Sequence, residues 1–123
     1  MPLTMLAALL LISAAIGSQE EPTAALPGAA HCAALFAFTY DNLKGKSGDP
    51  AMTRGFAEDA AALRAIVIAQ AKGENAEAAA DRAIAAERLL VEAGAQQRQA
   101  KGDETPVDLK PCYRVKALGP RGE

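Results

Sequence analysis

Few side chains in this sequence could do chemistry, and they are not spaced as a catalytic or metal site requires. His31 is the single histidine and directly precedes Cys32. Because neighbouring residues on a helix point about 100° apart, these two side chains are poorly placed to act as a nucleophile and its base. Their order also fails the Cys-x-x-Cys-His motif that binds haem covalently. We therefore expect His31 to be a solvent-exposed residue near the start of a helix, without a catalytic role.

Carboxylates are the second group of reactive side chains. Adjacent acids occur at 20–21, 58–59 and 103–104. The first and third pairs fall in segments that we expect to be flexible, and the middle pair diverges on a predicted helix. Metal binding and paired-carboxylate hydrolysis both need several such groups to converge. The sequence thus predicts no catalytic residue, no metal site and no cofactor; an enzyme whose site is built from distant residues is the alternative.

The sequence Gly45-Lys46-Ser47 shares three residues with a phosphate-binding loop. Such a loop requires a further glycine at position 40 and a strand before it. Position 40 is Tyr40, and the segment before it has helical periodicity. We therefore interpret the likeness as accidental.

The two cysteines, Cys32 and Cys112, lie far apart and match no metal-ligand spacing. An even pair in an exported chain is typically a disulfide. This bond would close most of the domain into one loop, which stabilises the fold by about 4 kcal/mol in the chain-entropy model. A metal pair, a reactive thiol and a bridge to a partner chain are the alternatives.

The N-terminal segment predicts export. Positions 1–17 contain no charged side chain, and the apolar run 6–16 is shorter than a membrane span. Small residues follow it where a signal peptidase cleaves. We predict a cleaved signal peptide at 1–18 and a bacterial periplasmic or extracellular location. Because a basic N-terminal region is missing, an uncleaved anchor is the alternative, and it would be the chain's one contact with a membrane.

Composition allows one small domain with a thin core. The 123 residues are 50% hydrophobic but only 4% aromatic, without tryptophan. Much of the apolar fraction is alanine, which buries little area. The formal net charge of -2 provides no basic field, so nucleic acid is excluded as a partner.

Three segments have the apolar spacing of helices, at about 28–43, 50–71 and 76–100. Asp49 and Pro50 form a helix start signal for the second. The second segment is apolar on two sides, which predicts the middle helix of a bundle, and Leu90 is among the residues expected to face inward from the third. An extended leader at 19–27 precedes the single helical domain at 28–123.

The C-terminal tail, from about residue 102, has three prolines and no helical periodicity. Short loops predict antiparallel helices, so the third helix ends far from Cys32. For the disulfide to form, the tail must return along a groove of the bundle, with Val107 and Leu109 pointing inward. The predicted fold is therefore all-α, a small antiparallel three-helix bundle whose extended C-terminal tail is joined to the first helix by a disulfide.

These features favour a non-catalytic exported protein that binds or assists another envelope protein. Surplus aromatic residues and the basic end of the chain are the expected contact residues: Phe38, Tyr40, Lys110, Tyr113, Arg114 and Lys116. An inhibitor or immunity-type protein that blocks a partner enzyme is one alternative. A periplasmic stress chaperone is another.

Overall fold

The computed structural model describes residues 26–46 and 48–121. The predicted signal peptide at 1–18 and almost all of the predicted leader lie outside these residues. The described elements are, in chain order, α2 (Ala29–Leu43), α3 (Pro50–Ala71), α4 (Ala76–Ala100), α5 (Lys110–Leu118) and the 3-10 helix η1 (Gly119–Arg121). The described part of the chain is all-α and contains no strand.

Local sequence signals explain where α3 begins and ends. The Asp49 side chain accepts a hydrogen bond of 2.9 Å from the backbone N–H of Ala51, and Pro50 occupies the first turn. Both features are favourable at a helix start. The helix ends where Lys72 and Gly73 adopt φ angles of 58° and 88°, a conformation that glycine tolerates well. The predicted bounds of this helix are confirmed.

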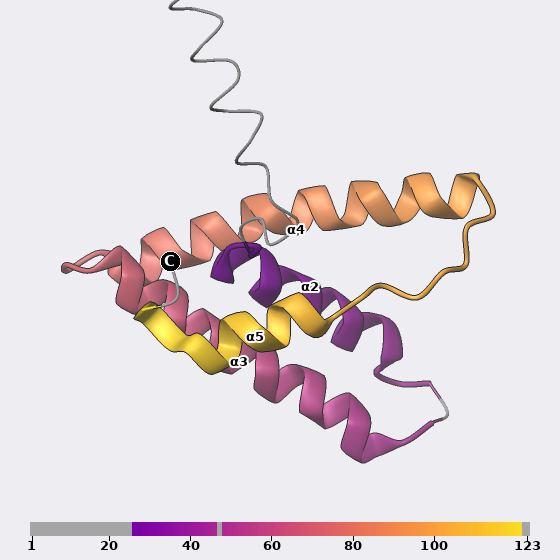
Figure 1. The fold of residues 1–123 in the computed structure, drawn as a ribbon, viewed down its shortest axis with the longest axis horizontal. Helices are drawn as coiled ribbons and strands as arrows, with labels where there is room; N and C mark the ends of the chain where they lie inside the picture. Colours follow the sequence, from indigo (N-terminus) through magenta and orange to yellow (C-terminus); the bar gives the residue numbers. More distant parts are fainter. Residues whose placement is uncertain (1–25, 47, 122–123) are drawn as a thin grey trace, which may run out of the picture.

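The three long helices pack as an antiparallel bundle, and the end of the chain returns along it (Figure 1). After α4 the chain crosses back to the opposite end of the bundle, and α5 lies against α2 and α3. The predicted bundle with a returning tail is thus confirmed.

The core is centred on α2. Phe36 of this helix and Leu63 of α3 are fully buried, whereas the buried positions of α4 are only Ala76 and Ala80. The core cluster comprises Ala29, Cys32, Ala33, Leu35, Phe36, Leu63, Ile66, Val67, Ala80, Cys112 and Val115. The helix predicted to be central, α3, is therefore less buried than α2. Leu90, predicted to face inward, is 64% exposed, because α4 turns a different side toward the bundle.

The sequence predicted an extended tail, but the tail is extended only in part. Residues 103–109 have no regular structure, and the chain then forms α5 and η1. Pro111 lies in the first turn of α5, where its missing N–H costs nothing. Leu109 is half-buried against the core as expected, but Val107 is 40% exposed.

Candidate functional site

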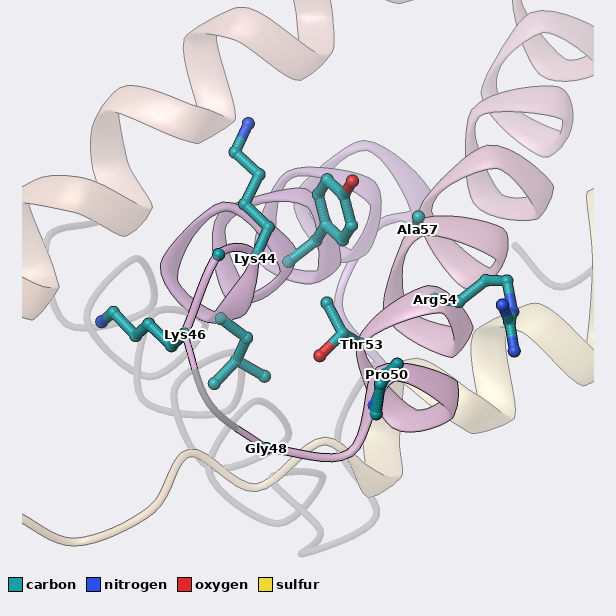
Figure 2. A pocket seen from close by; sticks show the side chains of 10 residues that line it. Lys44, Lys46, Gly48, Pro50, Thr53, Arg54 and Ala57 are labelled. Atoms are coloured by element: carbon teal, nitrogen blue, oxygen red, sulfur yellow. The ribbon is translucent and has the colours of Figure 1, made fainter.

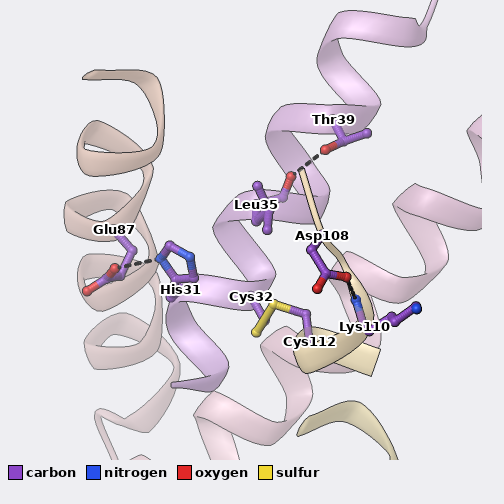
Figure 3. Close-up of a disulfide and its surroundings, with 8 residues drawn as sticks. All are labelled: His31, Cys32, Leu35, Thr39, Glu87, Asp108, Lys110 and Cys112. Atoms are coloured by element: carbon purple, nitrogen blue, oxygen red, sulfur yellow. Dashed lines mark hydrogen bonds and ion pairs between the residues drawn. A yellow bond between two sulfur atoms is a disulfide. The ribbon is translucent and has the colours of Figure 1, made fainter. Parts of the chain in front are cut away.

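The disulfide between Cys32 and Cys112 fastens α5 to α2 (Figure 3). The two Cα atoms are 5.3 Å apart, and both cysteines are buried. The predicted pairing is confirmed, and the described residues contain no free cysteine. A structural disulfide indicates that the protein folds in an oxidising compartment outside the cytoplasm.

His31 forms a hydrogen bond across two helices and does not pair with Cys32. Its Nδ1 atom lies 3.2 Å from Oε1 of Glu87 on α4, and the two side chains are 40% and 33% exposed. Figure 3 shows the imidazole directed toward α4 and the cysteine directed toward α5. The arrangement therefore lacks the contact that would activate a thiolate nucleophile.

The six predicted contact residues do not form one surface. Four of them lie on α5, namely Lys110, Tyr113, Arg114 and Lys116. The other two lie on α2: Phe38 lines a groove beside α4, while Tyr40 lines a separate hollow beside the loop that follows α2.

Two of the α5 residues mainly attach this helix to the bundle. The Tyr113 ring packs 5.1 Å from the ring of Phe36, and Lys116 Nζ donates a 2.6 Å hydrogen bond to Asp59 on α3. Burial raises the pKa of Tyr113, and the hydrogen bond to Asp59 raises the pKa of Lys116. Only Lys110 and Arg114 of this group remain exposed without such contacts among the described residues.

The hollow beside the α2–α3 loop has a volume of about 490 Å³ and is lined by Lys44, Lys46 and Arg54 among others. Figure 2 shows these three cationic side chains pointing away from one another. Lys44 also pairs with Asp41 at 3.1 Å. Since α2 rather than a strand precedes the loop, the hollow has neither the fold nor the converging charges of a phosphate site.

A second groove, of about 270 Å³, lies between α2, α4 and the tail segment 103–109. Its walls are mostly apolar and include Phe38, Val91 and Leu109, and Arg98 contributes a charged side chain. We call it the Arg98 groove. Sequence reasoning missed Arg98, because nothing in the periodicity of α4 shows that this arginine meets the returning tail. The one sequence signal was Phe38, which falls outside the main apolar stripe of its helix.

The outer face of α4 carries two exposed leucines. Leu89 is 68% exposed and Leu90 is 64% exposed. The exposed alanines Ala85, Ala86 and Ala93 surround them on the same side of the helix. We define these five residues as the α4 outer face. The sequence analysis placed Leu90 in the core. Apolar spacing alone does not show which of two neighbouring apolar sides of a helix faces the bundle.

The described ranges contain no cluster of histidine, cysteine and carboxylate side chains that could hold a metal ion. Nor do their helices include one with both the length and the apolar character needed to cross a membrane. No known protein family, curated protein or solved structure matches the chain.

Proposed function

We propose that this chain is a non-catalytic exported protein that binds or assists another protein in the bacterial periplasm or outside the cell. The α4 outer face carries this proposal. Leu89 and Leu90, 68% and 64% exposed, are the two most exposed large hydrophobic residues in the described part of the chain, and they are adjacent. Contiguous exposed apolar patches typically mark interaction sites.

The composition of this face indicates the type of partner. Ala85, Ala86 and Ala93 have small side chains, which let a second helix approach α4 closely. The five residues are uncharged, but exposed Arg82 lies on the same side of α4 one turn before Ala85 and Ala86. A partner helix centred on Leu89 and Leu90 would therefore leave this charge at the edge of the contact, in water. We therefore propose that the partner presents a helix with an apolar side, and that Leu89 and Leu90 are the main contacts.

Affinity co-purification of the oxidised protein from the envelope fraction of its host tests the proposal. Wild-type protein should retain one stoichiometric partner, and the double variant L89E/L90E should lose it. The matched control is Met52→Glu, since Met52 is also an exposed apolar residue, 52% exposed, but lies on α3. Intact-mass analysis of the same bait reports signal-peptide cleavage and the disulfide.

The outcomes separate the alternatives. Equal retention by L89E/L90E and wild type would remove the α4 outer face from the proposal. Loss of enzymatic activity in the captured partner would identify an inhibitor, and many weak clients would favour a chaperone. Concentration-dependent dimerisation abolished by L89E/L90E would show that a second copy occupies the face.

A further inference from the structure

The Arg98 groove continues into a second, more polar hollow. This second hollow measures about 540 Å³, and its lining includes Arg88, Glu92 and Gln96. The two share Phe38, Asn42, Ala95 and Arg98, so Arg98 lies at the boundary between them. The molecule thus has an apolar recess with a cation at the point where it opens to a polar surface.

Arg98 forms no salt bridge in the described part of the chain, although it attracts the nearby Asp103 carboxylate electrostatically. Its Nε atom is buried and makes no hydrogen bond there. Neighbouring Arg88, in contrast, is bound by Asp41 at 2.9 Å and by Glu92 at 2.8 Å. The nearby carboxylate of Asp103 accepts a hydrogen bond from the backbone N–H of Thr105. Because this Nε atom is shut off from solvent, a ligand carboxylate would instead reach the terminal guanidinium nitrogens, which are not buried in this way and form no salt bridge in the described residues.

We propose that the Arg98 groove binds a small amphipathic carboxylate. The aliphatic part lies in the apolar recess against Leu35, Phe38 and Val91, and the carboxylate accepts hydrogen bonds from the Arg98 guanidinium. Burial of the aliphatic part supplies affinity, and the charge-assisted hydrogen bonds fix its orientation. This combination of an apolar pocket with a few polar groups is typical of small-molecule sites.

The polar inventory of the groove favours a small molecule over a peptide segment. An extended peptide brings N–H and C=O groups that need partners when buried. The groove's Thr39 hydroxyl already donates to the Leu35 carbonyl at 2.8 Å. Asn42 is the remaining uncharged polar side chain of its lining. An aliphatic chain makes no such demand.

Isothermal titration of the oxidised full-length protein with decanoate tests the proposal. Wild type should bind decanoate saturably at one site. Decanol and decyltrimethylammonium should bind at least about ten-fold more weakly, because they lack the charge that Arg98 recognises. In Arg98→Gln, decanoate affinity should fall by a similar factor. The matched control is Arg82→Gln, which removes an exposed arginine from the same helix.

A second variant covers the case in which Arg98→Gln fails to fold. Val107, 40% exposed on the tail segment, lines the groove, so Val107→Trp should obstruct it while leaving the core intact. The proposal is overturned if wild type shows no saturable binding, if both variants bind decanoate normally, or if decyltrimethylammonium binds as well as decanoate. An acetylated peptide ending in a free leucine carboxylate that binds more tightly than decanoate, through Arg98, would overturn it in favour of a peptide ligand.

Discussion

At the scale of single residues, the disulfide makes the largest identifiable contribution to stability. Cys112→Ser should lower the free energy of unfolding by about 4 kcal/mol, because the unfolded chain regains the freedom of a long loop. Denaturant titration of wild type and variant measures this loss. Cys32→Ser and the double variant should lose the same amount, since each breaks the same bond.

Non-covalent contacts of α5 could also hold this helix in place, and the size of the loss in Cys112→Ser distinguishes their contribution from that of the disulfide. Val115 is buried, the Tyr113 ring packs on Phe36, and Lys116 pairs with Asp59. A loss below about 1 kcal/mol would mean that these contacts hold α5 in place without the covalent bond.

His31 should be dispensable for the fold. Because both side chains of the His31–Glu87 pair are well exposed, His31→Ala should change the free energy of unfolding by at most about 1 kcal/mol. Thermal unfolding measures this change, with Glu87→Ala as the partner control. A folded His31→Ala protein that has lost its biological activity would contradict the non-catalytic proposal.

Residue chemistry was easier to predict from the sequence than residue location. Two cysteines allow only one internal pairing, so Cys32–Cys112 followed directly once a disulfide was chosen. The sequence could not show that Phe38 and Arg98 share a groove, because their proximity depends on how α4 is rotated and where the tail crosses it. It also could not distinguish exposed Leu90 from a core leucine.

At the scale of elements, helix boundaries with a chemical signal were predictable. Asp49→Ala should lower stability by about 1 kcal/mol, because the N–H of Ala51 loses its acceptor. Asp49→Asn keeps an acceptor of the same shape and should leave stability almost unchanged. Equal losses in the two variants, measured by urea unfolding, would show that the charge rather than the cap matters.

The prediction failed for α5, and the reason is its length. Nine residues contain too few turns for a periodicity to stand out, and isolated helices of this length are unstable in water. Two local features support the helix in the fold. The Asp108 carboxylate accepts from the Lys110 N–H at 3.0 Å, and Pro111 lies in the first turn. Burial of Cys112 and Val115 on one side then holds it against the bundle.

At the scale of the whole molecule, α5 and α4 are held to the bundle by a different balance of forces. The helix α5 is attached by the disulfide and by buried apolar side chains. The buried residues of α4 are two alanines, with Ile84 and Val91 half-buried against the core, and ion pairs including Arg88–Asp41 and Arg64–Asp81 join it to its neighbours. Conditions that weaken ion pairs should therefore affect α4 before α5.

Acid should expose this difference. The hydrogen bond from Arg88 lowers the pKa of Asp41, and that from Arg64 lowers the pKa of Asp81, both below 3.8. The unfolded state therefore takes up these protons at a higher pH than the folded state. The stabilisation that the ionised Asp41 and Asp81 carboxylates give to the fold is complete above about pH 5. It is lost as the pH falls through their lowered pKa values in the folded protein. Hydrogen exchange near pH 3 should show α4 opening first, and Asp41→Asn should weaken the acid dependence.

At alkaline pH we expect stability to be lost as the pH rises, and the loss to begin at α5 rather than at α4. The pKa values of Tyr113 and Lys116 are raised above 10.0 and 10.5. The stabilisation they provide is therefore present below those values and is lost as the pH rises through the raised ones. Both residues lie on α5, so alkaline loosening should begin there, within the limit set by the disulfide. Denaturant midpoints across the pH range should form a plateau that falls at both ends, and a midpoint that rises below about pH 4 would contradict the ion-pair account of α4.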